Sequence, residues 1–183
     1  MDVVKPFKDS WEIYSKNFIT IFLSLIGAIA LSCITLGILM MPLLVGFMMQ
    51  FVKAKRGQAI AFNDIFEPIG AKYWPLTLAG LWTGLLTSFG FALLILPGLC
   101  WSAWWLYTYY FIADKNLGIG AAMRASKDLV RKNDIWMHIV FIILVGAVVG
   151  VGSSVPLAGP VLGLLLLPIS LGAISCAYVE EAK

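Results

Sequence analysis

Four basic side chains recur at helical spacing in one polar segment of the sequence, and their chemistry suits the binding of an anion. They are Arg124, Lys127, Arg131 and Lys132. In a helix over residues 118–133 they share one face, opposite an apolar face. An amphipathic helix of this kind lies in the headgroup layer of a membrane, where a basic cluster binds anionic lipid. The four residues are therefore candidates for contacting lipid headgroups. The alternative is a helix that only packs on the end of a helical bundle.

No other arrangement of reactive residues predicts catalysis. The sequence has no zinc-protease, serine-hydrolase or phosphate-loop motif, and its apolar runs contain no carboxylate. His138 is the only histidine, and its position favours a role in helix packing near the membrane interface. Cys33, Cys100 and Cys176 match no metal-binding spacing and are expected to be small apolar residues of membrane helices. We expect no catalytic, cofactor-binding or metal-binding residues, and a protein that is not an enzyme.

The composition is that of an integral membrane protein. Hydrophobic residues make up 61% of the 183 residues and charged residues 13%, whereas a soluble domain is about half apolar and a quarter charged. The net charge of +3 is too small to indicate a nucleic-acid partner. Three runs, residues 17–52, 73–113 and 135–179, contain no Asp, Glu, Lys or Arg. We expect one integral membrane domain over residues 1–183.

Each uncharged run is too long for one crossing of a bilayer, because about 20 apolar residues span the hydrocarbon core. The runs are 36, 41 and 45 residues long. Reading each run as a hairpin places both termini and both charged loops on the cytoplasmic side, in agreement with the positive-inside rule. The expected fold is therefore all-α, a polytopic bundle of six short transmembrane helices arranged as three hairpins in the cell inner membrane. No secretory signal is evident.

The three hairpins predict an internal repeat, with units at about 5–56, 60–116 and 118–181. From the aromatic residue that enters each run to the proline near its middle the distance is 24, 23 and 24 positions. The pairs are Phe18 and Pro42, Trp74 and Pro97, and Trp136 and Pro160. A fixed bilayer thickness is the alternative explanation of the spacing. Each unit is expected to begin with an amphipathic interfacial helix.

The three prolines are expected to open the returning helix of each hairpin, at its first position, where a missing N–H costs nothing. Pro42, Pro97 and Pro160 are thus structural residues of the hairpins. The first hairpin is the shortest. If one hairpin fails to cross the membrane fully, we expect it to be the one around Pro42.

Three further patterns leave functional alternatives open. Ser32, Thr35, Thr83, Thr87 and Ser88 could line a path for a neutral or amphipathic solute, although such residues more often bond their own helix backbone. Glycine pairs four residues apart predict close helix contacts; they are Gly80 and Gly84, Gly146 and Gly150, and Gly159 and Gly163. The aromatic run over residues 101–111 predicts packing or, as an alternative, a groove for an apolar ligand.

Three segments carry a family resemblance: "FKDSWEIYSKNF", "LPGLCWSAWWLYTYYFIADKNLGIGAAMRASKDLVRKN" and "PLAGPVLGLLLLPISLGAISCAYVE". Together they resemble a broad group of uncharacterised prokaryotic six-span membrane proteins, related to the membrane region of some bacterial glycerophosphodiester phosphodiesterases. Its most specific part is Leu-Pro-Gly at 96–98, the aromatic span, Asp114, Ala122 and Ser126. The resemblance implies six helices with cytoplasmic termini. It supplies no catalytic residues, because the phosphodiesterase activity belongs to a soluble domain with no counterpart in this sequence.

These observations favour a non-enzymatic inner-membrane protein that acts through membrane lipids or through another membrane protein. The alternative is a small transporter or channel for a neutral or amphipathic solute. An enzyme acting on lipid is the weakest of the three hypotheses. The sequence names no ligand, and it leaves the oligomeric state open.

Overall fold

The chain folds into helices joined by short connections. The computed structural model describes residues 3–154 and 159–182, without the side chains of residues 151–153 and 160, and contains no strand in that part of the chain. The elements are α1 (Lys5–Lys16), α2 (Phe18–Ile34), α3 (Met40–Lys55), the 3₁₀ helix η1 (Phe62–Ile69), α4 (Tyr73–Leu93), α5 (Ile95–Trp104), α6 (Thr108–Lys115), α7 (Ile119–Lys132), α8 (Ile135–Ser153) and α9 (Gly159–Glu181).

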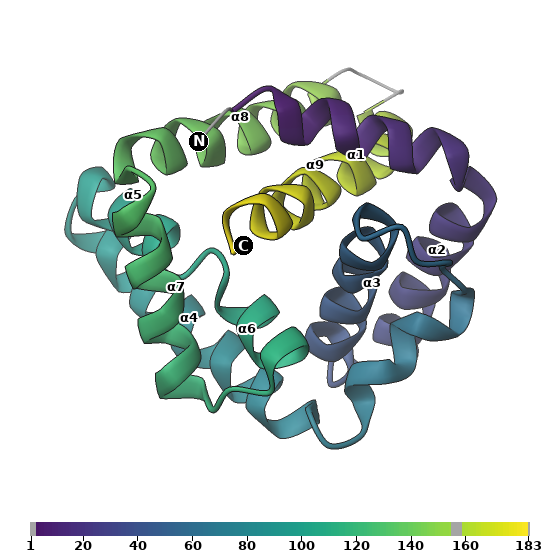
Figure 1. Ribbon diagram of the computed structural model, residues 1–183, viewed down its shortest axis with the longest axis horizontal. Coiled ribbons are helices and arrows are strands. Elements are labelled where there is room, and N and C mark those ends of the chain that lie inside the picture. Colours follow the sequence, from purple (N-terminus) through teal and green to yellow (C-terminus); the bar gives the residue numbers. More distant parts are fainter. Residues whose placement is uncertain (1–2, 155–158, 183) are drawn as a thin grey trace.

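The last helix, α9, is the centre of the fold. It packs against α1, α3 and α8 and is drawn in yellow in the middle of Figure 1. Its contact face carries small residues, which let neighbouring backbones approach closely. Ala173 and Cys176 are fully buried, and Ser10 of α1 donates a hydrogen bond to the carbonyl oxygen of Ile169 at 2.8 Å. The sequence-distant ends of the chain are therefore joined in one core.

Two sharp bends set short polar helices across long apolar ones. The axes of α1 and α2 differ by 96°, and those of α7 and α8 by 104°. At the second bend Asp134 adopts a left-handed backbone conformation with φ 72°, which short polar residues tolerate best. Its carboxylate accepts a hydrogen bond from the backbone N–H of Trp136 at 3.0 Å, so it caps the start of α8. If α2 and α8 cross a membrane, α1 and α7 lie along its surface.

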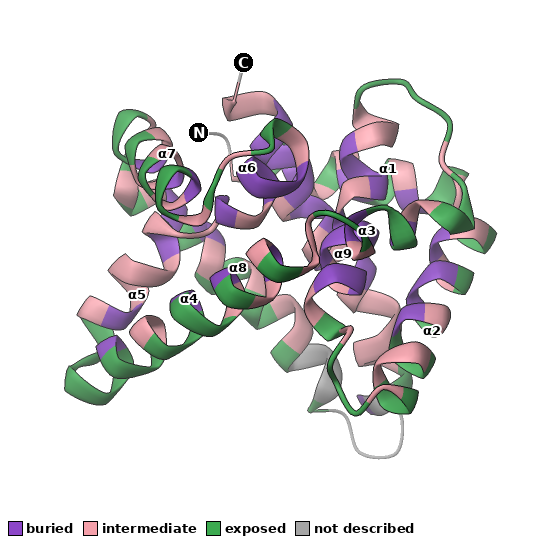
Figure 2. Cartoon of the chain, turned by 90° about the horizontal axis from the view of Figure 1, so that it is seen from below, coloured by how far each residue is buried: buried purple, intermediate pink, exposed green. Residues whose placement is uncertain are grey.

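Large apolar side chains cover the outer surfaces of α2, α4 and α8. Exposed residues on the ribbons of these helices are green in Figure 2. On α4 they include Leu81, Leu85 and Phe89, each more than half exposed. Such continuous apolar surface is unusual on a soluble protein and is suited to lipid. The exposed large apolar side chains on the three helices include Ile19, Leu23, Ile26, Ile29, Leu78, Leu81, Trp82, Leu85, Phe89, Val140, Ile143 and Leu144.

The three entering aromatic residues also face outward. Phe18, Trp74 and Trp136 stand at the starts of α2, α4 and α8 and are 44%, 67% and 65% exposed. Each follows a charged segment directly. Aromatic side chains in this position form the belt found at membrane–water interfaces.

The number of membrane crossings is the main difference from the sequence prediction. By length and composition, α4 and Val161–Glu181 of α9 can cross a membrane, and up to four spans result if each bent pair, α1 with α2 and α7 with α8, counts as one. Six spans are therefore not established. The first hairpin contributes helices of only 17 and 16 residues, about 25 Å each, which is short for a hydrocarbon core of about 30 Å.

The returning segment of the second hairpin, α5 with α6, also differs from the predicted single transmembrane helix. The aromatic run does not form one helix, because the chain breaks between Trp104 at the end of α5 and Thr108 at the start of α6. Of the predicted interfacial helices, α1 and α7 are regular α-helices, whereas the middle copy is the 3₁₀ helix η1 with Pro68 inside it. The elements of the three predicted units follow the order short helix, apolar helix, returning segment.

The prolines lie slightly deeper in their helices than predicted. Pro42 and Pro97 are each the third residue of α3 and α5, and Pro160 is the second residue of α9. The first four N–H groups of a helix have no partner within it, so a proline at the third position also costs no hydrogen bond. The connection before α9, residues 155–158, lies outside the described residues.

The glycine prediction is wrong in part. An added Cβ at Gly84 or Gly146 would meet no atom within 4 Å, so neither glycine lies at a close helix contact. The prediction is right for Gly80, where an added Cβ would clash with the side chain of Met41 in α3. Further close contacts involve glycines outside the predicted pairs, notably Gly46 and Gly172. An added Cβ at Gly46 would lie 2.7 Å from the carbonyl carbon of Ile65 in η1. The four-residue spacing identifies small residues but not the face of the helix that packs.

Candidate lipid-headgroup interface

The helix that carries the four basic residues is held in place by a buried serine. Ser126 lies in the buried stripe of α7 with Ala122 and Val130. Its hydroxyl donates to the carbonyl oxygen of Trp104 at 2.7 Å and accepts from the backbone N–H of Tyr107 at 3.1 Å. Because these backbone groups lie at the break between α5 and α6, Ser126 replaces hydrogen bonds that a continuous helix would make. This contact fixes α7 across the broken segment.

The opposite face of α7 presents its positive charges outward. Arg124, Arg131 and Lys132 are exposed, whereas Lys127 is half-buried, with its Nζ 4.5 Å from the centre of the Trp104 ring. In the described part of the chain, none of the four lies within 4 Å of a carboxylate oxygen. Asp128, although four residues from both Arg124 and Lys132, forms no ion pair there. At least three cations are thus available to an anion from outside the protein.

The other charged segments gather at the same end of the bundle, where their charges pair with one another. Five lysine–carboxylate pairs join α1, α3, η1 and α9. They are Lys5 with Glu180 at 2.7 Å, Lys53 with Asp64 at 3.1 Å and with Glu67 at 2.7 Å, and Lys55 with Asp9 and with Glu180, the latter at 3.6 Å. These cations are neutralised within the protein, which sets the basic face of α7 apart from them.

The best-formed ion pair joins α3 to the end of α6. Both guanidinium nitrogens of Arg56 donate to the carboxylate of Asp114, at 2.7 and 2.8 Å, and Tyr178 donates to the same carboxylate at 2.9 Å. The Arg56 guanidinium holds the pKa of the Asp114 carboxyl below its ordinary value. Asp114 therefore stays ionised and ties the second unit to the first and the third.

A buried histidine–glutamate pair lies where α8 meets the end of α9. His138 is completely buried, and its Nε2 lies 2.7 Å from Oε2 of Glu181, whose side chain is 8% exposed. Its Nδ1 lies 2.8 Å from the carbonyl oxygen of Asp134. A carbonyl oxygen only accepts, so Nδ1 carries a proton, and a second proton lies between Nε2 and the carboxylate. The packing role expected for His138 thus includes a charged or proton-sharing partner.

Glu181 is a site residue that sequence reasoning missed. It lies just beyond the third uncharged run, 43 positions from His138, and nothing in the local pattern marks it as buried. Its Oε1 and the hydroxyl of Tyr107 are buried without a hydrogen-bond partner among the described residues. The Tyr107 ring packs edge-on against His138, with ring centres 5.7 Å apart. Only the return of α9 alongside α8 brings these groups together.

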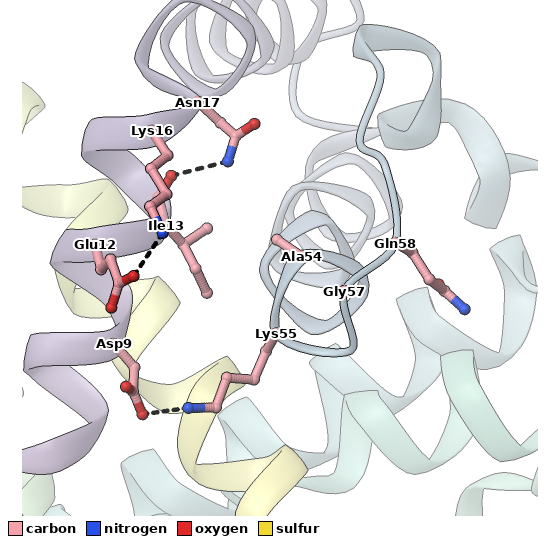
Figure 3. Close-up of a pocket in the computed structure, with 9 residues that line it drawn as sticks. All are labelled: Asp9, Glu12, Ile13, Lys16, Asn17, Ala54, Lys55, Gly57 and Gln58. Atoms are coloured by element: carbon pink, nitrogen blue, oxygen red, sulfur yellow. Dashed lines mark hydrogen bonds and ion pairs between the residues drawn. The ribbon is translucent and has the colours of Figure 1, made fainter.

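A polar cavity separates α1 from the end of α3 (Figure 3). It has a volume of about 360 Å³, and its lining carries both signs of charge. Lys55 reaches across to Asp9, and Lys16 pairs with Glu12 at 2.6 Å along α1. Because these charges are already paired, the cavity offers less to an anion than the face of α7 does.

The residues considered for transport and metal binding are dispersed. Thr83 and Thr87 line one cavity and Ser32 another, while Thr35 and Ser88 line neither. The hydroxyls of Thr35 and Thr83 bond carbonyl oxygens of their own helices, each at 2.8 Å. The three cysteines are unpaired. Among residues 3–154 and 159–182 no cluster of His, Cys, Asp and Glu is arranged to hold a metal ion.

Fold and interface together define an all-helical protein with two to four helices apolar enough to cross a membrane. No protein-family model matches the chain, and no curated protein or solved structure shows significant similarity to it. The resemblance stated for the sequence therefore stays a prediction.

Proposed function

We propose that this protein is a multi-pass inner-membrane protein that performs no catalysis and acts by binding anionic lipid headgroups, or a membrane protein, at its charged end. The proposal includes six crossings as three hairpins, with both termini in the cytoplasm. The observation that carries it is the contrast in charge pairing. In α1 and α3, Lys5, Lys16, Lys53 and Lys55 pair with carboxylates, and Lys8 is the exception among the described residues. By contrast, Arg124, Arg131 and Lys132 lie exposed together on one helix without such a pair.

The orientation of α7 supports the same proposal. Since α7 is bent 104° from α8, it lies parallel to the membrane surface when α8 crosses the bilayer. The exposed Trp136 follows directly and marks the interface level. Lys127 lies against Trp104, so the basic face starts at the boundary of the apolar region. Phosphate groups of anionic lipids lie at this depth.

Transport of a neutral or amphipathic solute is the second candidate. Its support is the hydroxyl groups of Thr83 and Thr87 on one cavity. The other Ser and Thr residues are dispersed and do not form a continuous polar path with this cavity. Transport therefore has less support than lipid binding.

Replacing Arg124, Lys127, Arg131 and Lys132 together by glutamine is expected to weaken binding of phosphatidylglycerol to the detergent-purified protein at least tenfold. Each basic side chain near an anionic surface contributes about 1 kcal/mol. Binding is measured by native mass spectrometry, with phosphatidylcholine as the neutral reference. The control is the triple variant Lys8→Gln, Lys16→Gln and Lys115→Gln, which removes exposed cations elsewhere at the charged end. Unchanged binding in the α7 variant, or an equal loss in the control, contradicts the proposed interface.

The topology has its own test. In a variant without native cysteines, a cysteine at Gln58 is expected to react with a membrane-impermeant maleimide only after the cells are opened, because the loop between α3 and η1 faces the cytoplasm. A cysteine at Ser153, at the end of α8, is expected to react in intact cells. Labelling of both positions from the same side contradicts the hairpin topology.

A further inference from the structure

The cavity lined by Thr83 and Thr87 lies among the apolar helices. It has a volume of about 340 Å³ and lies between α3, α4, the α5–α6 segment and α9, within the size range of small-molecule sites. Val45, Met48 and Thr83 are buried in its wall, whereas Gly84 is exposed and Thr87 half-buried. The cavity therefore opens onto the apolar outer surface of α4.

The residues that line the cavity disfavour a charged ligand. None of the described residues that line the cavity is Asp, Glu, Lys, Arg or His. A charged ligand would lose its hydration without gaining a counter-charge, which is strongly unfavourable in an apolar environment. The cavity is therefore suited to a neutral ligand that enters from the apolar outer surface of α4.

Hydroxyl groups in the lining have unused hydrogen-bonding capacity. Thr83 donates to the carbonyl oxygen of Ala79 at 2.8 Å, so Tyr109, whose hydroxyl lies 2.6 Å away, donates to Thr83. The Tyr109 oxygen is then left as an acceptor. The Ser102 hydroxyl likewise donates its hydrogen bond to the carbonyl oxygen of Gly98 at 2.8 Å. Thr87 makes no hydrogen bond within the described residues, so it remains available as a donor.

A ligand that satisfies these groups both donates and accepts a hydrogen bond at one point and is apolar elsewhere. An aliphatic hydroxyl has this property. We propose that the cavity binds a neutral lipid alcohol, with its hydroxyl between Thr87 and Tyr109 and its chain leaving past Gly84. A Cβ added at Gly84 would meet no atom of another element within 4 Å, so a chain can pass there. The site is separate from the α7 interface, and either proposal can fail without the other.

The test uses the full protein in phosphatidylcholine nanodiscs and a long-chain alcohol bearing a photoactivatable diazirine, with the matching alkane as reference. The alcohol is expected to label residues of the cavity wall saturably, with an affinity about tenfold above that of the alkane. This ratio corresponds to about 1.4 kcal/mol, which is within the net contribution of the two hydrogen bonds that the hydroxyl makes. Replacing Thr83 and Thr87 by valine removes this advantage. The control is Thr35→Val, whose hydroxyl lines neither this cavity nor the one at Ser32.

A second pair of variants tests the location. Gly84→Leu fills the opening and is expected to abolish saturable labelling, whereas Gly146→Leu, at an equally open glycine of α8, leaves labelling unchanged. Circular dichroism verifies that both variants are helical. Equal labelling by alcohol and alkane overturns the proposal, because the cavity would then be a groove for any lipid chain. Full labelling of the Gly84→Leu variant overturns it as well.

Discussion

Replacing Glu181 by alanine is expected to lower the free energy of unfolding by roughly 3–5 kcal/mol, the usual cost of breaking a buried ion pair. The alanine leaves Nε2 of His138 buried without its partner, since His138 is 0% exposed and Glu181 lies 2.7 Å from it. Water cannot reach the nitrogen unless the end of α9 separates from α8. The loss is measured by denaturant titration in mixed micelles, followed by circular dichroism.

Two companion variants identify the cause of the loss. Glu181→Gln is expected to cost only about 1 kcal/mol, because an amide N–H can donate to Nε2 while Nδ1 still donates to Asp134. The double variant His138→Phe with Glu181→Leu replaces both polar partners by apolar groups, and we expect it to be more stable than Glu181→Ala. Equal losses in the alanine and glutamine variants would show that the buried pair does not stabilise the protein.

Replacing Gly46 by valine is expected to destabilise the protein by about 3 kcal/mol, at the upper end of the usual cost of overpacking. An added Cβ would lie 2.7 Å from the carbonyl carbon and 2.8 Å from the Cα of Ile65, and closer still to its carbonyl oxygen. These are backbone atoms of η1, which cannot rotate away as a side chain would. The same titration measures the change.

The matched control is Gly146→Val, in which the added side chain meets no atom within 4 Å. We expect its free energy of unfolding to stay within about 1 kcal/mol of the original. A small effect at Gly46 equal to that at Gly146 would mean that η1 does not pack on α3 as described.

The helical class and the basic face of α7 follow from local information. The uncharged runs, the amphipathic pattern of α7 and the entering aromatics depend on residue type and spacing, and the structure has α7 at residues 119–132 within the predicted 118–133. The buried face of α7, which holds Ala122 and Ser126, also follows from a period of 3.6 residues. Local information does not predict whether each apolar helix is long enough to cross a membrane. Breaks such as the one after Trp104 depend on a contact with a distant segment, here Ser126 of α7.

The sequence by itself determined that the chain is helical and apolar, where its charges are, and that α7 has a basic face, because these depend on composition and on the period of one helix. Only the tertiary structure decided which glycines are crowded, which cations of the charged end are neutralised, and that Glu181 lies against His138. These depend on contacts between segments far apart in the chain: Gly46 meets Ile65, Arg56 meets Asp114, and the end of α9 meets α8. No local spacing encodes such distances.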